Sequence, residues 1–407
     1  MILKINNLNS ENIIYYINKD CFWNMDIIEF KIPTKIIFGA NSLDSLSEVI
    51  KKYGGRVIIA TDGNSFNQIG LIDQIVNKLN DNFINSMVYS EITSTNSSDA
   101  ADIIANLVRY SKADCIVAVG GFKVQNAAKG ASVVVTNSGE SSDYVNGQPV
   151  YHKPLPIISI PTILGSLSEM TLGMYLYDKY DEVYKECADS NIYVKDCIID
   201  PTLYETVPVK YSISSALSVF ALSFDVYMSN SLNIINEPLI KYAMKTSISG
   251  INKLITDSAN VDNIGSMAIS NITCAAASCN GNFGAIRALS IAINSVYSVN
   301  KSIVCSILLP YVMEYYMASA PKKYNVLADF IENIDKEMTP IEIGIQAGQY
   351  IKRIQQDINL PMKLNELNID RNKFDKVAEL ALTYSGMDKL PRAMSKESII
   401  NILEQAY

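Results

Sequence analysis

Two adjacent glycines after a short apolar run are the first residues in this sequence that suggest chemistry. Residues 116–119 are apolar, Gly120 and Gly121 follow, and an alanine-rich stretch continues to Lys129. Such a run with β-branched members is typical of a buried strand in a parallel sheet. Glycines after it allow a tight turn and leave N–H groups free at a helix start, which suits a phosphate. An ordinary strand-to-helix turn has the same appearance, so both interpretations stay open.

Imidazole chemistry is limited because the chain contains a single histidine, His152. Prolines flank it in residues 148–154, which predicts a loop. A site that needs two imidazoles cannot form within one chain. The seven cysteines are scattered, odd in number and without a CxxC pair, which favours reduced and mostly buried thiols.

Composition excludes several classes of function. The 407 residues are 48% hydrophobic and 19% charged, as in a globular protein long enough for two domains. The net charge is −8 and lysine and arginine form no long cluster, which argues against nucleic-acid binding. Apolar runs are too short for a membrane span, and the N-terminus lacks a secretory pattern. We therefore expect a cytoplasmic protein with no membrane or nucleic-acid partner.

The first half of the chain alternates between strand and helix patterns. Strands are expected at 56–63, 86–89, 116–119, 132–136 and 156–160, and a strand pair or bent strand at 29–39. Helices are expected at 42–52, at 71–79 and after the capping residues 97–99. The alternation predicts an α/β layer with a parallel sheet. Ligands of such sheets bind beyond the carboxyl ends of the strands, where Asp62, the two glycines and the loop 162–169 stand.

The pattern changes to long helices after Pro208. Helical periodicity covers residues 213–229, 237–257, 264–279, 285–298 and 303–318. We expect an N-terminal extension at 1–26, an α/β nucleotide-binding domain at 27–207 and an all-helical domain at 208–407. Tyr15, Tyr16 and Trp23 of the extension could dock on the body or on a partner.

An ordered set of short motifs carries a family resemblance. The motifs are Phe38-Gly39, Thr61-Asp62, Gly120-Gly121 with Lys129, Ile160-Pro161-Thr162 with Gly165, Ser168, Glu169 and Thr171, Asp200-Pro201, Pro208, Leu308-Leu309-Pro310 and Val312-Met313. From about residue 28 to its end, the chain resembles the iron-containing, NAD(P)-dependent alcohol dehydrogenases. The resemblance implies an N-terminal dinucleotide-binding domain and a C-terminal helical domain, an architecture like that of dehydroquinate synthase, with coenzyme, metal and substrate in the cleft between them. It also implies a homodimer paired through N-terminal strands, and residues 30–38 have the composition of an edge strand.

This sequence has residues of other types at the positions of that family's metal ligands. The family holds iron or zinc with an aspartate, a histidine four residues later and two later histidines about fourteen residues apart. Counting from Asp200 and from Pro310 places Ser218, Leu222, Arg287 and Lys301 at these positions, and Ile291 where a histidine lies by the nicotinamide. Leucine has no lone pair, and two cations would repel a dication by several kcal/mol. We expect no catalytic metal.

The coenzyme turn is altered as well. The family's three glycines and a serine are here Gly120-Gly121-Phe122-Lys123, an aspartate is replaced by Asn126, and a glycine by Leu167. The Phe122 ring would crowd a pyrophosphate, whereas Lys123 would pair with a phosphate or point into solvent. Asp62 stands where a ribose hydroxyl would be read. NAD(P) is the candidate coenzyme, and its expected contacts are Asp62, Gly120, Gly121, Lys123, Lys129, Thr162 and Ser166.

Two functions remain open. The chain is a non-catalytic or nucleotide-binding relative, which the joint loss of four ligands and three loop residues favours, or it is an NAD(P)-linked oxidoreductase of a small alcohol or aldehyde. In the second case Arg287 and Lys301 would supply the positive charge of the metal. The alternative for these two cations is a solvated or internally paired cluster, with Asp225 as a partner.

Overall fold

A six-stranded parallel sheet forms the first half of the chain in the computed structural model, which describes residues 28–63, 70–205, 207–257 and 261–407. The strand order is β1-β8-β5-β4-β2-β3. The strands are β1 (Lys35–Phe38), β2 (Arg56–Thr61), β3 (Asn85–Tyr89), β4 (Cys115–Val119), β5 (Ile157–Ile160) and β8 (Asp196–Ile199). Thr61 pairs with Val119, and Val119 pairs with Ile160. The carboxyl ends of β2, β4 and β5 therefore meet at one edge of the sheet.

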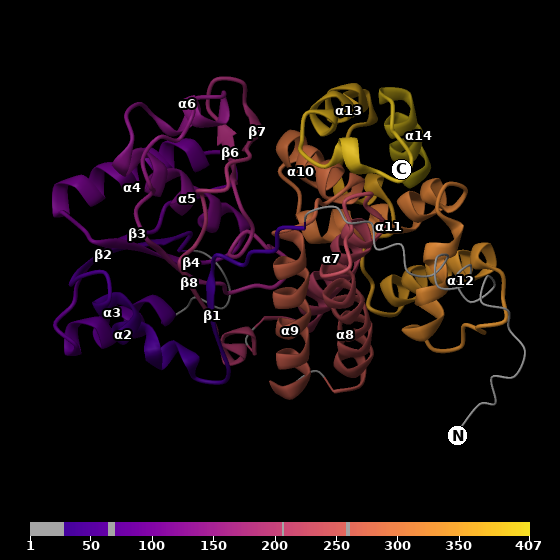
Figure 1. Ribbon diagram of the computed structural model, residues 1–407, viewed down its shortest axis with the longest axis horizontal. Helices are drawn as coiled ribbons and strands as arrows, with labels where there is room; N and C mark the ends of the chain where they lie inside the picture. Colours follow the sequence, from indigo (N-terminus) through magenta and orange to yellow (C-terminus); the bar gives the residue numbers. More distant parts are fainter. Residues whose placement is uncertain (1–27, 64–69, 206, 258–260) are drawn as a thin grey trace, which may run out of the picture. The chain divides into compact units, whose positions relative to one another are not determined.

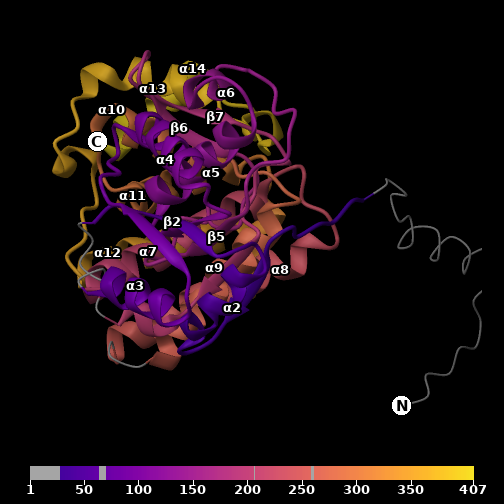
Figure 2. The same cartoon turned by 90° about the vertical axis from the view of Figure 1, so that its left-hand side faces the viewer.

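Alternate side chains of the sheet belong to two separate hydrophobic clusters. On β2, Ile58 and Ala60 belong to the larger cluster, and Val57 and Ile59 to the smaller one. Helices α4 (Ser97–Ser111) and α5 (Phe122–Thr136) cover the first face, and α2 (Leu46–Lys51) and α3 (Leu71–Asp81) the second, as Figure 2 shows. Every residue of β4 is buried, as a strand covered on both faces requires.

The strand predicted at residues 132–136 is wrong. Helix α5 continues without interruption to Thr136, and Val133 and Val134 are buried in the larger cluster. A run of β-branched residues favours strands, but burial of one helix face overrides that preference. The structure also contains an antiparallel hairpin, β6 (Met174–Asp178) and β7 (Val183–Cys187), which the sequence pattern did not indicate.

The second half is helical, so the predicted fold class is confirmed. Its principal helices are α7 (Val209–Met228), α8 (Asn236–Thr256), α9 (Val261–Ser278), α10 (Ala285–Tyr297), α11 (Lys301–Met317), α12 (Pro340–Asp357), α13 (Phe374–Leu382) and α14 (Lys396–Ala406). Residues 31–407 form one compact unit, in which α10 packs on β7 (Figure 1). The domain division at Pro208 stays a prediction, and the extension 1–26 lies outside the described residues.

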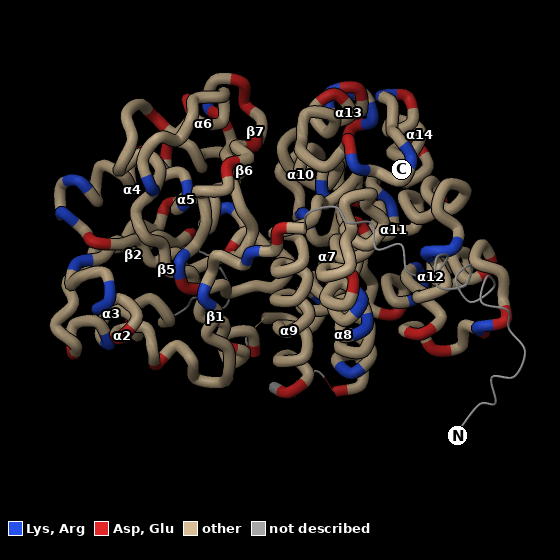
Figure 3. Tube along the Cα trace, viewed as in Figure 1, with Lys and Arg blue, Asp and Glu red and all other residues tan. Residues whose placement is uncertain are grey.

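Charged residues of both signs are interleaved along the α/β half and the helical half (Figure 3). Among the helices that the structure describes, none is both long and apolar enough to cross a membrane.

The end of β4 gives a stability prediction. Gly120 has a φ of +151°, and a Cβ there would lie 2.7 Å from Val124 Cγ2. Because valine is rigid about χ1, it cannot move aside cheaply. We expect Gly120→Ala to lower the free energy of unfolding by about 2 kcal/mol, measured by urea denaturation.

The matched control is Gly265→Ala within α9, where φ lies outside the positive range and an added Cβ would meet no atom within 4 Å. That variant should gain up to about 1 kcal/mol because alanine restricts the unfolded chain. Equal unfolding free energies for the two variants would contradict the strained turn.

Candidate functional site

The turn between β4 and α5 presents backbone N–H groups beyond the sheet. Gly121 is the N-cap residue of α5, and it has no side chain with which to bond the first N–H groups of the helix. A Cβ at Gly121 would lie 2.8 Å from Ile163 Cγ2, so the turn and the loop after β5 approach each other closely. A helix start of this kind favours an anion, because orphan donors and the helix dipole act together.

A cavity of about 310 Å³ lies at this turn. It brings together Asp62, Gly121, Lys123, Ser166 and Lys301 of the predicted site residues. The sequence did not point to the rest of its lining, chiefly Tyr184, Asn294, the connection 298–300 between α10 and α11, and Ser302. One signal was available: Asn300 caps α11, accepting from the N–H groups of Ser302 at 2.9 Å and Ile303 at 3.3 Å.

Lys123 forms an ion pair with Asp62, and the Nζ–Oδ2 distance is 3.1 Å. The Asp62 side chain is 7% exposed and that of Lys123 35% exposed. Free solvation therefore does not describe Lys123, and its contact with a phosphate stays a prediction. Asp62, which is expected to read a ribose hydroxyl, is thus paired with a lysine from the β4–α5 turn.

The Phe122 ring lines the same cavity and rests on two tyrosines. Its centroid lies 5.7 Å from that of Tyr184 and 6.1 Å from that of Tyr175. Lys301 Nζ lies 5.0 Å from the Phe122 ring centroid, a cation–π distance. The ring therefore occupies space at the turn, as its position in the sequence suggested, and also supports a cation.

Lys301 is the first residue of α11 and is buried. Its Nζ lies 3.4 Å from the carbonyl oxygen of Gly165, to which it donates. Burial first, and the charge of Arg287 second, lower the pKa of Lys301 to about 8. A cation at the positive end of a helix is also disfavoured by the helix dipole. An anion bound in the cavity would relieve each of these costs.

Gly120, Lys129 and Thr162 are not among the described residues that line this cavity. Lys129 is fully buried, and its Nζ donates to the carbonyl oxygens of Thr171 at 2.7 Å and Gly173 at 2.9 Å. Burial lowers its pKa to about 7. The Lys129 side chain thus ties α5 to the segment that enters β6. Thr162 is buried at the end of β5.

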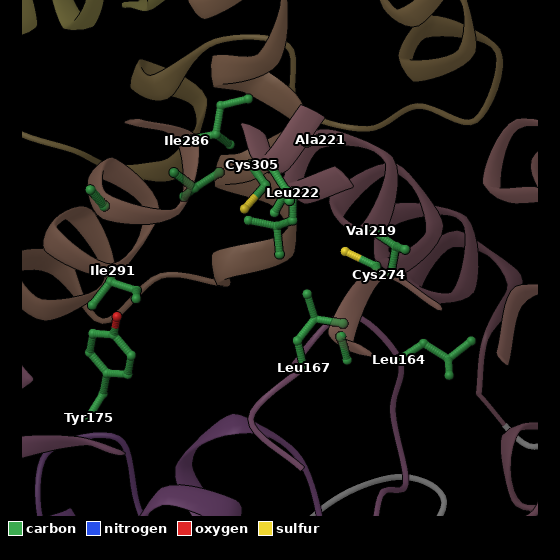
Figure 4. Packing of buried hydrophobic residues seen from close by; sticks show 14 of the residues in the cluster. Leu164, Leu167, Tyr175, Val219, Ala221, Leu222, Cys274, Ile286, Ile291 and Cys305 are labelled. Carbon is green, nitrogen blue, oxygen red and sulfur yellow. The ribbon is translucent and has the colours of Figure 1, made fainter. Parts of the chain in front are cut away.

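The positions counted as metal ligands do not present metal donors. Ser218 and Leu222 are fully buried on α7, and the Ser218 hydroxyl has no described hydrogen-bond partner. Leu222 belongs to a cluster of apolar side chains that includes Cys274 and Cys305 (Figure 4). Within the described ranges, no group of three or more His, Cys, Asp or Glu residues could hold a metal ion. The donor chemistry does not fit a set of one aspartate and three histidines.

Arg287 lines a different cavity from Lys301. It is 3% exposed, and its guanidinium lies 4.3 Å from the Phe283 ring centroid and 5.3 Å from that of Tyr175. Asp225 accepts from the backbone N–H groups of Ile286 at 3.2 Å and Arg287 at 2.9 Å, so it holds the start of α10. Burial raises the pKa of Asp225 to about 7. The two cations expected to act together are thus divided between two cavities.

Comparison with known proteins identifies the family of the chain. Residues 33–201 match the family model of iron-containing alcohol dehydrogenase, and residues 212–407 match the C-terminal model of the same family. A 1,3-propanediol dehydrogenase of Citrobacter freundii is 23% identical over 94% of this chain and 99% of its own length. The NADH-dependent butanol dehydrogenase A of Clostridium acetobutylicum is 24% identical over 93% and 99%.

Solved structures support the same fold. An alcohol dehydrogenase from Oenococcus oeni superposes with a TM-score of 0.87 at 22% identity, covering 94% of this chain and all of the other. Two family models together span most of the sequence, and they meet close to the change from strands to long helices. The chain therefore belongs to the iron-containing alcohol dehydrogenase family.

Proposed function

We propose that the cavity at the β4–α5 turn binds the phosphate of a nucleotide, and that the chain does so without metal-dependent alcohol oxidation. The observation that carries the proposal is the convergence of the α5 start, with no capping side chain from Gly121, and buried Lys301 on one cavity. Among the described lining residues, Lys123 pairs with Asp62, which leaves Lys301 as the charge without a carboxylate partner in the lining. That charge balance favours an anion.

The size of the cavity narrows the ligand class. A volume of about 310 Å³ lies at the lower end of the range of about 300–1,000 Å³ for small-molecule sites. Phe122 occupies part of the turn. These features favour a mononucleotide, or a dinucleotide held mainly by one phosphate-bearing half. NAD(P) stays a candidate on these grounds.

The metal-free part of the proposal rests on donor chemistry. A hydroxyl, an alkyl group and two cationic side chains replace the family's ligands at the counted positions. The alternative, an NAD(P)-linked dehydrogenase in which Arg287 and Lys301 polarise one substrate oxygen, requires both cations at one point. Because they line separate cavities, the geometry favours binding over this chemistry.

We also propose that the chain forms a homodimer and is located in the cytoplasm. β1 lies at an edge of the sheet, and Phe38 at its end is 41% exposed, which favours pairing between two copies. Sedimentation of the purified chain at the monomer mass would exclude the dimer.

Nucleotide binding is the direct test. We expect ADP and NAD⁺ to bind with dissociation constants of about 1 mM or below in calorimetry. The Lys301→Met substitution should lower the affinity for ADP at least about tenfold. The matched control is Lys352→Met, because Lys352 Nζ also lies 5.0 Å from an aromatic centroid, that of Tyr311, but outside the cavity. Absence of binding by the wild-type chain, or equal losses in both variants, would contradict the proposal.

Titration of Lys301 gives a pH prediction. Its pKa of about 8 means that it carries charge below pH 8 and loses it above. ADP keeps its charge from pH 7 upward, because the second phosphate pKa is near 6. ADP affinity should therefore fall as pH rises through 8, by up to about tenfold per pH unit. In Lys301→Met the affinity should stay flat, and a wild-type affinity that rises with pH would exclude this role.

Metal content tests the metal-free part of the proposal. Chain purified after expression with added iron and zinc should contain metal far below one equivalent by elemental analysis, because cations and an alkyl group replace the ligands. The comparison variant carrying Ser218→Asp, Leu222→His, Arg287→His and Lys301→His restores the donor types of the family, and its zinc content shows whether the four positions converge on one ion. Stoichiometric metal in the wild-type chain would overturn the metal-free proposal.

A further inference from the structure

The cavity around Arg287 is lined by both halves of the chain and has a volume of about 280 Å³. Its α/β side includes Tyr175 on β6, Glu186 on β7 and Asp189 after β7. Its helical side includes Arg287 on α10 and Phe283 before it. No described residue lines both this cavity and the one at the β4–α5 turn. The two cavities therefore have different linings, although Phe122 of one contacts Tyr175 of the other.

Part of the Arg287 guanidinium lacks acceptors. The side chain is almost fully buried, and its Nε and Nη1 atoms have no hydrogen-bond partner among the described residues. No described carboxylate forms an ion pair with it within 4.0 Å. A buried, unsatisfied cation is costly, and its natural complement is a carboxylate that accepts two N–H bonds. The rings of Phe283 and Tyr175 hold the guanidinium in place for such a partner.

Two carboxylates of the chain lie on the other side of the same cavity. Glu186 is already engaged, since Oε1 accepts from Tyr175 Oη at 2.6 Å and Ser385 Oγ at 2.7 Å, and Oε2 accepts from Ser385 N at 2.7 Å. Asp189 Oδ1 accepts from Asn191 N at 2.7 Å. A simple anion would meet these carboxylates, and a simple cation would meet Arg287. A molecule that carries both charges would be complementary to the lining.

We propose that this cavity binds a small α-amino acid, whose carboxylate pairs with Arg287 and whose ammonium group faces Asp189. The volume equals that of about nine water molecules, which suits a ligand of about six to ten heavy atoms. Hydroxyl groups of Thr171, Ser190 and Ser278 also line the cavity and can bond polar atoms of the ligand. The proposal does not depend on nucleotide binding, because it concerns other residues.

Calorimetry with single compounds tests the charge requirement. Glycine, alanine, serine and aspartate are compared with acetate, which lacks the ammonium group, and with ethylamine, which lacks the carboxylate. We expect at least one amino acid to bind at least about tenfold more tightly than both truncated compounds. Binding of acetate with equal affinity would overturn the zwitterion assignment, and no binding by any amino acid would overturn the site.

Two variants test which residue binds the carboxylate of the ligand and which residue faces its ammonium group. The Arg287→Gln substitution should lower the affinity for the amino acid about 10- to 100-fold. The Asp189→Asn substitution should lower it about 3- to 10-fold and leave the affinity for acetate unchanged. The matched control for Arg287 is Arg392→Gln, since the Arg392 guanidinium also lies over a tyrosine ring, at 4.2 Å from the Tyr315 centroid, but outside the cavity. Asp189 lies in a partly exposed loop, so its variant keeps the test valid if Arg287→Gln folds poorly. Unchanged amino-acid affinity in Asp189→Asn would overturn the proposed orientation.

Discussion

Buried positive charge is the constraint that shapes the region between the sheet and the helices. Lys129, Arg287 and Lys301 are each at least nine-tenths buried, and burial of a cation is tolerated only where acceptors or aromatic faces replace water. Lys129 uses two backbone carbonyls, Lys301 one carbonyl and the Phe122 ring, and Arg287 two rings.

Buried carboxylates compensate this charge only in part. Glu169 is fully buried, and one of its oxygens accepts from Asn271 at 2.7 Å, while the other has no described partner. Its charge raises the pKa of both Lys129 and Lys301, opposing the effect of burial. Asp225 is committed to the start of α10. Among these buried groups the remaining imbalance is positive, which favours ligands that place a negative group beside Arg287 or Lys301.

Much of the fold could be predicted because it depends on local patterns. Runs of buried apolar residues located β2, β4 and β5, and the 3.6-residue period located α7 to α11 within a few residues. The strand expected at 132–136 failed because those β-branched residues lie on a helix that the sheet and the β6–β7 hairpin bury. Periodicity alone cannot separate a buried helix end from a buried strand.

The candidate site could be predicted only in part, because side-chain partners depend on tertiary contacts. The convergence of Asp62, Gly121, Lys123, Ser166 and Lys301 followed from strand order, since all but Lys301 stand beyond strand ends. The ion pair between Lys123 and Asp62 did not, because it joins residues 61 positions apart whose side chains have other options. Likewise, spacing placed Arg287 and Lys301 in one site, but their helices direct them to different cavities.

The tilted and edge-to-face contacts among the rings of Phe122, Tyr175, Tyr184 and Tyr384 have a thermodynamic consequence. Phe122 and Tyr184 line one cavity, whereas Tyr175, which contacts Phe122 and Tyr384, lines the other. These contacting rings therefore belong to the linings of both cavities. A ligand that displaced Phe122 in one cavity would move Tyr175 in the lining of the other. Each ligand would then change the affinity of the other, and thermodynamic linkage requires the same coupling free energy in both directions.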